Sequence, residues 1–213
     1  MKLKINEIYY SIQGESSYAG IPCIFVRLTY CNLRCSYCDT EYAFYDGKEM
    51  TIHEIIDKVE EYNCDLVEIT GGEPLLQKDC IKLIAELENK NKKILIETGG
   101  ALSIKEISKK THIILDVKCP SSNMSDRNLL DNFKYIKKTD EIKFVIGNQE
   151  DYLWAKNMIK KYKLDKKCSI LISPVHNKIK EKTIVDWILK DNLNVRFQIQ
   201  LHKKIWDEST KGV

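Results

Sequence analysis

Three cysteines, Cys31, Cys35 and Cys38, stand within eight residues near the start of the chain. Thiolates with this spacing on one loop can ligate three irons of a 4Fe–4S cluster. One iron is then left without a protein ligand, and an enzyme can leave that position open for a bound molecule. The alternative is zinc, which needs a fourth ligand from Cys or His. No other pair of these residues stands at zinc-finger spacing, so the pattern favours an iron–sulfur cluster.

The composition is that of an ordinary globular protein. The 213 residues are 43% hydrophobic and 31% charged, with a net charge of +3. No basic stripe indicates nucleic-acid binding, no apolar run is long enough to cross a membrane, and no signal-peptide pattern opens the chain. The other five cysteines are scattered singly, which argues against a disulfide framework and a second cluster. We therefore expect one cytoplasmic domain over residues 1–213.

Apolar runs rich in β-formers alternate with stretches of helical period. The predicted strands are 22–30, 66–70, 93–97, 113–117, 141–146, 169–172 and 194–200. The predicted helices are 51–63, 75–89, 103–109, 149–163 and 180–190, and two of them begin with capping boxes, at Thr51 with Glu54 and at Ser103 with Glu106. This alternation indicates an α/β fold with parallel strands. About six units are too few for a closed eight-fold barrel, so we expect an open, partial (β/α) barrel.

Polar residues and glycines follow the predicted strands at the points where these end. In (β/α) barrels the C-terminal strand ends carry the functional residues. The cysteine loop follows the first of these strands, and the later ones end at Gly71–Pro74, Glu97–Gly100, Asp116–Pro120, Ser173 and Gln200–Lys203. We therefore expect these segments to meet in one site.

Several of these residues also allow a structural interpretation. Gly72 and its neighbours could simply turn the chain from strand into helix. Arg27 lies inside an apolar strand and needs an anionic partner, either within the protein or on a substrate. Lys118 could be a solvated lysine or an anion ligand, Tyr37 could only pack its loop, and Ser173 could be a turn residue.

The cysteine spacing resembles that of radical S-adenosylmethionine (SAM) enzymes, and Gly71–Pro74 resembles their Gly-Gly-Glu-Pro turn. Further segments narrow the resemblance to the 7-carboxy-7-deazaguanine synthase family. They are Gln13-Gly-Glu15, Arg27 in its strand, Cys38-Asp-Thr40, Glu97-Thr-Gly-Gly100 and Gln200-Leu-His-Lys203. The resemblance runs from about residue 8 to the last predicted strand.

The resemblance implies a radical SAM core and a carbon–nitrogen lyase activity. Enzymes of this family convert 6-carboxy-5,6,7,8-tetrahydropterin to 7-carboxy-7-deazaguanine with loss of ammonia, a step toward queuosine and other 7-deazapurines. The implied mechanism abstracts hydrogen at C6, rearranges the substrate radical and returns a hydrogen, so SAM acts as a true cofactor.

The resemblance also implies roles for single residues. The substrate would contact Ile12, Gln13, Gly14, Glu15, Arg27 and Thr70, with Arg27 pairing with its carboxylate. SAM would contact Tyr37, Gly72, Glu73, Lys118 and Ser173. The cluster would be held by Cys31, Cys35 and Cys38, and a Mg²⁺ ion by Thr40. Glu97 and His202 are pocket-lining candidates without an assigned role.

The expected partners are the small pterin substrate, an electron donor such as flavodoxin or ferredoxin, and a second copy of the chain in a homodimer. The residues from Trp206 to Val213 differ from the proline-ending tail of many relatives. The sequence therefore does not identify which C-terminal residue closes the pocket. Two other functions are considered: an activase that forms a glycyl radical on a partner protein, and a non-catalytic iron–sulfur or zinc module.

Overall fold

The computed structural model describes residues 1–207 and 210–213. The strands are β1 (Lys2–Ile12), β2 (Pro22–Leu28), β3 (Lys48–Thr51), β4 (Leu66–Gly71), β5 (Lys93–Thr98), β6 (His112–Asp116), β7 (Glu141–Ile146), β8 (Ser169–Pro174) and β9 (Arg196–Phe197). The α-helices are α1 (Ile52–Glu60), α2 (Cys80–Asn89), α3 (Gln149–Tyr162), α4 (Glu181–Asp191) and α5 (His202–Ile205).

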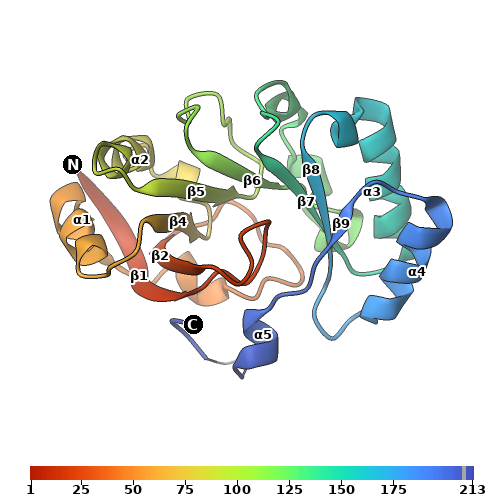
Figure 1. Ribbon diagram of the computed structural model, residues 1–213, viewed down its shortest axis with the longest axis horizontal. Coiled ribbons are helices and arrows are strands. Elements are labelled where there is room, and N and C mark those ends of the chain that lie inside the picture. The colour runs from red at the N-terminus through yellow and green to blue at the C-terminus, as the bar shows by residue number, and fades with distance from the viewer. Residues whose placement is uncertain (208–209) are drawn as a thin grey trace.

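The nine strands form one curved sheet in the order β3-β1-β2-β4-β5-β6-β7-β8-β9. From β2 to β9 every neighbouring pair is parallel. The edge strands β3 and β9 do not pair with each other among the described residues, so the sheet is open (Figure 1). The predicted α/β fold with a partial, open barrel of parallel strands is confirmed.

The start of the chain adds an antiparallel edge that the sequence did not place. β1 pairs antiparallel with β2 on one side and with β3 on the other. Only nine residues, 13–21, join β1 to β2. Such a short connection allows antiparallel pairing, whereas parallel neighbours need a longer crossover.

Successive side chains of the parallel strands point to opposite faces of the sheet. On β4, Val67 and Ile69 belong to the large apolar core, which also contains the buried residues of α1 to α4. These helices lie along the outside of the sheet (Figure 1). Glu68 and Thr70 of β4 alternate with Val67 and Ile69, so they point to the inner face, where they are buried. The inner face therefore holds the polar side chains, above a small apolar cluster that includes Phe25.

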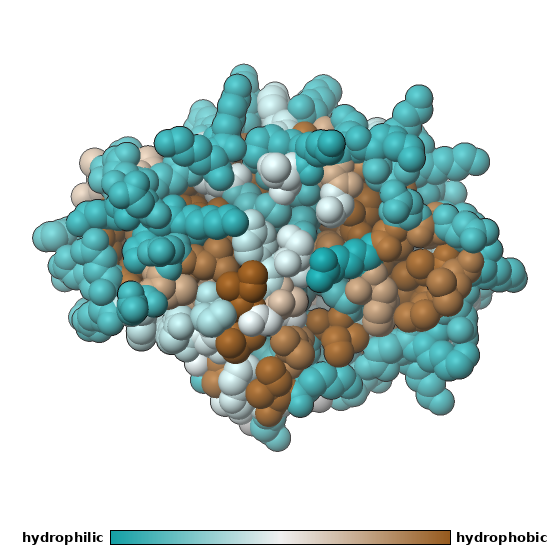
Figure 2. Space-filling view, in the orientation of Figure 1, coloured by the Kyte–Doolittle hydropathy of each residue, from teal (hydrophilic) through white to brown (hydrophobic). Residues whose placement is uncertain are grey.

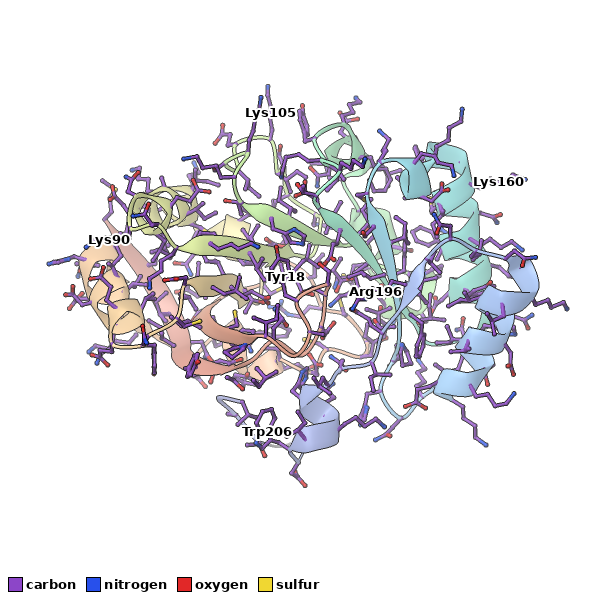
Figure 3. All side chains as sticks on the ribbon, viewed as in Figure 1. Tyr18, Lys90, Lys105, Lys160, Arg196 and Trp206 are labelled. Atoms are coloured by element: carbon purple, nitrogen blue, oxygen red, sulfur yellow. The ribbon has the colours of Figure 1, made fainter. Side chains whose placement is uncertain are left out.

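The loop between β1 and β2 crosses the inner face of the sheet. The N–H of Ser16 donates to Gln198 Oε1 (2.8 Å) and the N–H of Ser17 donates to Glu141 Oε1 (2.9 Å). Figure 3 shows Tyr18 of this loop at the centre of the molecule. The loop thus occupies the interior that a closed barrel would fill with side chains, and it brings residues 13–15 close to the ends of the parallel strands.

Three predicted elements differ from the structure. The helix predicted over 75–89 begins only at Cys80, after a 3-10 turn at Pro74–Leu76. The helix predicted over 103–109 is wrong, because the segment forms turns. Ser103 Oγ accepts from the N–H of Lys105 (3.3 Å), and Asn132 holds the segment through Ile104 N–H (3.2 Å) and Leu102 O (2.8 Å). The strand predicted over 194–200 shortens to β9.

The capping box predicted at Thr51 is confirmed at the start of α1. Thr51 Oγ1 accepts from the N–H of Glu54 (3.2 Å), and the Glu54 carboxylate accepts from the N–H of Thr51 (2.7 Å). Within the described residues, no helix is both long enough and apolar enough to span a membrane.

Candidate active site

The three cysteines lie on the loop that follows β2. Each is partly buried and none forms a disulfide. The N–H of Leu33 donates to Cys31 Sγ (3.4 Å), and the N–H of Cys38 donates to the carbonyl of Cys35 (3.2 Å). Burial raises the pKa of all three thiols, while the nearby Lys118 ammonium opposes that shift. Each thiol would therefore have to release its proton on binding a metal.

The donor set fits a cubane cluster better than a single ion. A zinc ion requires its ligands to converge on one point, whereas the cysteines of a 4Fe–4S cluster each bind a different iron. In the part of the chain that the structure describes, no three His, Cys, Asp or Glu side chains converge on a single-ion site. Three separated thiols on one loop leave a fourth iron free of protein ligands.

The turn after β4 packs directly against the start of the cysteine loop. Gly71 has φ +146°, and a Cβ there would lie 2.1 Å from the carbonyl oxygen of Leu28. A Cβ on Gly72 would lie 2.3 Å from the carbonyl oxygen of Tyr30 and 2.8 Å from Cys31 Cβ. Glycine is therefore required at both positions for the turn to approach the loop. The structural and functional interpretations of these glycines thus describe the same contact.

Glu73 and Lys118 lie on either side of Gly99, beside the cysteine loop. The Glu73 carboxylate is fully buried and accepts from Thr98 Oγ1 (2.8 Å) and the N–H of Gly99 (2.8 Å), and burial raises its pKa. A Cβ on Gly99 would lie 2.8 Å from Leu33 Cδ1, 3.4 Å from Glu73 Oε2 and 3.5 Å from Lys118 Cε. Gly99 therefore separates a carboxylate from an ammonium next to the cysteines, a pairing suited to the amino and carboxylate groups of an amino acid.

The other residues predicted to contact SAM are Tyr37, Lys118 and Ser173, and their surroundings differ. The Tyr37 hydroxyl is buried without a hydrogen-bond partner among the described residues, and burial raises its pKa. Lys118 Nζ lies 2.9 Å from Asp116 Oδ2. Ser173 is buried at the end of β8, two strands beyond β6 where Asp116 lies. The assignment of Ser173 to SAM stays a prediction.

Arg27 pairs with an acidic residue that the sequence did not single out. Its Nε donates to Glu7 Oε1 (2.7 Å) and its Nη2 donates to the hydroxyl of Tyr9 (2.9 Å). Tyr42 also donates to Glu7 Oε1 (2.9 Å). A guanidinium has five N–H donors, so these bonds leave donors that can bind a further anion. The internal ion pair and the predicted substrate contact are therefore compatible. The signal for Glu7 lay in the alternation of β1, which places it opposite Arg27.

Deeper on the inner face, Gln13 bonds to Glu68 of β4. Burial, and then the neighbouring Glu97 carboxyl, raise the pKa of Glu68 to about 8. The Glu68 carboxyl is therefore protonated more readily than an exposed one, and when protonated it can donate as well as accept. Thr70, two residues further along β4, is buried beside Arg27 in the strand register.

Lys143 of β7, like Glu68, is a further residue that the sequence did not single out. Its Nζ donates to Glu15 Oε2 (2.9 Å) and to Glu97, and it lies 3.5 Å from Asp116 Oδ2. Both Glu68 and Lys143 stand as charged residues inside apolar strands. A charged residue inside an apolar strand indicates a buried ion pair or a ligand contact, and the sequence analysis drew this conclusion only for Arg27.

The C-terminal segment packs against the loop after β1. Gln200 Nε2 donates to Glu15 Oε1 (2.9 Å), and the N–H of Leu201 donates to the carbonyl of Gly14 (2.9 Å). A Cβ on Gly14 would lie 2.3 Å from His202 Nδ1, so glycine lets this ring approach the loop. Burial lowers the pKa of His202. The pocket-lining role of His202 stays a prediction.

Asp39 joins the cysteine loop to the same C-terminal segment. Lys203 Nζ donates to Asp39 Oδ2 (2.6 Å), and Thr40 Oγ1 donates to Asp39 Oδ1 (2.9 Å). Although burial acts in the opposite direction, Lys203 holds the pKa of Asp39 well below its usual range. Thr40 thus lies beside Asp39, two residues after Cys38, and its Mg²⁺ role stays a prediction.

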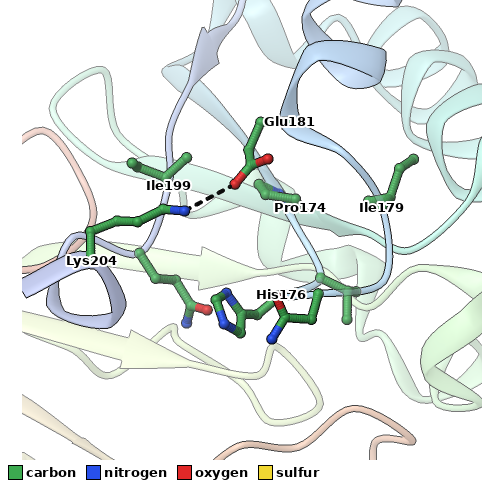
Figure 4. Close-up of a pocket in the computed structure, with 9 residues that line it drawn as sticks. Pro174, His176, Ile179, Glu181, Ile199 and Lys204 are labelled. Carbon is green, nitrogen blue, oxygen red and sulfur yellow. Dashed lines mark hydrogen bonds and ion pairs between the residues drawn. The ribbon is translucent and has the colours of Figure 1, made fainter. Parts of the chain in front are cut away.

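Two surface depressions flank the site. Ile12 lines an open groove at the end of β1, together with Tyr10, Pro22, Trp206 and Val213. The second depression lies beside β8, where Lys204 and Glu181 form an ion pair of 3.4 Å (Figure 4). Its volume of about 20 Å³ holds roughly one water molecule, so it is too small for a pterin.

The fold and the cysteine loop define a class of enzyme. Residues 26–188 match the family model described as Radical SAM superfamily. The solved structure of QueE from Escherichia coli is similar in fold, with a TM-score of 0.79, 22% sequence identity and 95% of each chain covered. The protein is a radical SAM enzyme, whose cofactors are a 4Fe–4S cluster and SAM.

Curated relatives identify the family within this class. The 7-carboxy-7-deazaguanine synthase of Chlorobaculum tepidum is 44% identical over 99% of this chain and 97% of its own length. The enzyme of the same name from Koribacter versatilis is 42% identical over 99% of this chain and 100% of its own length. The chain belongs to the 7-carboxy-7-deazaguanine synthase family.

Proposed function

We propose that the protein converts 6-carboxy-5,6,7,8-tetrahydropterin to 7-carboxy-7-deazaguanine and ammonia, as a lyase of 7-deazapurine (queuosine) biosynthesis. The observation that carries this proposal is the juxtaposition of two half-sites. Glu73 and Lys118 lie on either side of Gly99 beside the cysteine loop, and a group of buried polar residues that includes Arg27, Gln13 and Glu15 lies on the inner face of the same sheet.

On the cofactor side, Cys31, Cys35 and Cys38 would hold the cluster. When bound, the cluster and SAM together supply a radical that removes hydrogen from the substrate. The Glu73 carboxylate would bind the ammonium group of SAM, and the Lys118 ammonium its carboxylate. These two groups are already fixed by Thr98 and by Asp116, so SAM would meet a preformed site. Gly72, Tyr37 and Ser173 would complete its contacts.

On the substrate side, the free donors of Arg27 would bind the substrate carboxylate. A Mg²⁺ ion held by Thr40 would bind the same carboxylate, since magnesium prefers oxygen ligands and keeps few protein contacts. Gln13, Gly14 and Glu15 would contact the edge of the ring, with Ile12 and Thr70 alongside. The buried inner face would exclude water from the reacting substrate.

The substrate is a small molecule, and radical SAM chemistry requires a reductant. We propose flavodoxin or ferredoxin for this role, since both are one-electron donors. We also propose a single domain over residues 1–213 and a cytoplasmic location, the latter supported by eight free cysteines.

A homodimer is proposed from the exposed apolar surface. Tyr10, Ile21 and Ile205 are 46%, 45% and 53% exposed. Figure 2 shows apolar residues gathered where the loop after β1 meets α5, and a second group over α4. Exposed apolar patches of this kind mark interaction surfaces. Burial against a second copy would remove such a patch from water.

Anaerobic turnover tests the proposed reaction. The reconstituted protein is mixed with SAM, Mg²⁺, a reductant and 6-carboxytetrahydropterin, and products are followed by mass spectrometry. We expect 7-carboxy-7-deazaguanine to form without stoichiometric loss of SAM. The Cys35→Ala variant is the control and should not cleave SAM. Cleavage of SAM to 5′-deoxyadenosine without deazaguanine would exclude this substrate and favour another radical SAM reaction, such as glycyl-radical formation on a partner protein.

A further inference from the structure

Lys143 is a buried ammonium surrounded by carboxyl groups from three parts of the chain. Its side chain is 6% exposed. Its Nζ bonds to Glu15 in the loop after β1 (2.9 Å) and to Glu97 of β5, and it lies 3.5 Å from Asp116 Oδ2 of β6. A buried charge is costly unless it is paired. Lys143 is therefore held by the same three carboxyls that it holds in place.

These carboxyls belong to the two half-sites. Asp116 also binds Lys118, which faces the cysteine loop. Glu15 also accepts from Gln200 in the C-terminal segment. Lys143 therefore connects the residues proposed for SAM with those proposed for the substrate, through one cation and without an intervening apolar layer.

The charge balance around Lys143 makes the cation necessary. Three carboxyls, Glu15, Glu97 and Asp116, face two ammonium groups, Lys143 and Lys118, and a fourth carboxyl, Glu68, lies close by. Burial alone would raise the pKa of Glu15, but Lys143 lowers it below its ordinary value. Without the Lys143 ammonium, neighbouring buried carboxylates would repel one another, take up protons and turn to other partners.

We propose that Lys143 is a positioning residue that aims Glu15 and Glu97 at the substrate. The class of ligand edge that suits them is one rich in N–H donors, such as the aminopyrimidine edge of a pterin, because carboxylates only accept when ionised. The proposal rests on the proposed function. A substrate held loosely at this edge reacts poorly even when SAM is cleaved normally, since small displacements reduce rates strongly.

Two variants of Lys143 and one matched control test the proposal. Lys143→Met removes the ammonium, and Lys143→Arg keeps the charge with a different shape. Lys156→Met is the control, because Lys156 also pairs with a carboxylate, Asp191 (2.8 Å), but on the outer helices. For the wild type and each variant, we would measure the substrate KM and kcat, the ratio of 5′-deoxyadenosine to product and the iron content. The affinity for the fluorescent substrate analogue 6-carboxypterin is measured as well.

We expect Lys143→Met to raise the substrate KM by about tenfold or more and to raise the ratio of 5′-deoxyadenosine to product, with iron content unchanged. Analogue affinity should fall in parallel. Lys143→Arg should be intermediate, and Lys156→Met should match the wild type.

An unchanged KM and an unchanged product ratio in Lys143→Met would overturn the proposal. If Lys143→Met does not fold, Lys143→Arg decides: weakened substrate binding with an intact cluster supports the role, and normal binding overturns it. Loss of fold and cluster in both variants would also overturn it, because Lys143 would then be purely structural. A wild type that binds the analogue but forms no product would contradict the proposed reaction, while analogue affinity in the variants would still decide the role of Lys143.

Discussion

At the scale of single residues, Arg27 serves two partners. Glu7 and Tyr9 use its Nε and Nη2, and this internal pairing makes burial of the guanidinium tolerable. The remaining donors form a planar fork that a lysine cannot reproduce. Binding of a substrate carboxylate would therefore depend on the planar shape of the Arg27 guanidinium as well as on its charge.

We predict that Arg27→Lys raises the substrate KM by roughly 10- to 100-fold, while the iron content stays at about four per chain. The charge remains but bidentate binding is lost. Steady-state kinetics and an iron assay on the reconstituted variant provide the measurement. Glu7→Gln is the matched comparison, because it removes the internal partner and should lower the thermal midpoint more than Arg27→Lys does. Loss of the cluster in Arg27→Lys would assign Arg27 a structural role alone.

At the scale of elements, the site depends on how closely two turns approach the cysteine loop. The turn after β4 touches the loop through backbone atoms at Gly72, whereas the turn after β5 faces the space between Glu73 and Lys118 at Gly99. The loop is also held from the far side, where the N–H and hydroxyl of Ser36 donate to the carbonyls of Ser122 (3.0 Å) and Ser121 (2.6 Å).

We predict that Gly72→Ala and Gly99→Ala have different effects. The new Cβ at position 72 would lie 2.3 Å from a backbone oxygen and 2.8 Å from Cys31 Cβ, so the loop must shift and iron content should fall. The new Cβ at position 99 meets the flexible end of Leu33 and the space proposed for SAM, so iron should be retained while the KM for SAM rises about tenfold. Iron assays and SAM kinetics on both variants are compared. Equal iron loss in both variants would contradict the assignment of Gly72 to the cysteine loop and of Gly99 to the space proposed for SAM.

At the scale of the whole molecule, the open sheet makes room for a polar interior. The loop after β1 and the C-terminal segment cover the inner face, and the helices cover the outer one. The cysteine loop joins β2 to the rest of this cover through Asp39 and Lys203. Binding of the cluster should therefore stabilise the whole fold, because a ligand bound only by the native state shifts the unfolding equilibrium.

We predict that reconstitution of the cluster raises the thermal midpoint of the wild type by roughly 5 °C or more. Anaerobic thermal unfolding before and after reconstitution measures the shift, and treatment with an iron chelator should reverse it. Cys35→Ala should show no shift, since it lacks one ligand. An equal shift in Cys35→Ala would mean that the cluster is not held by this loop.

The parts of the protein that the sequence predicted well are those set by neighbouring residues. Cysteine spacing, the Gly71–Gly72 turn, the Thr51 capping box and the alternation of strands and helices are all local patterns. The helix predicted over 103–109 was wrong because its backbone groups bond to Asn132, about thirty residues away, in place of one another. The strand predicted over 194–200 is reduced to Arg196–Phe197, because only these two residues pair with β8.

The sequence by itself determined the class of chemistry, because three thiols on one short loop, with glycines and charged residues after the strands, suffice to indicate it. Only the tertiary structure decided how the charges pair. Lys143 and Glu15 are 128 residues apart in the chain, and Gln13 and Glu68 are 55 apart. Such pairs exist only once the sheet has curved and the loop after β1 has crossed its inner face. Their energies depend on burial, which a local pattern does not contain.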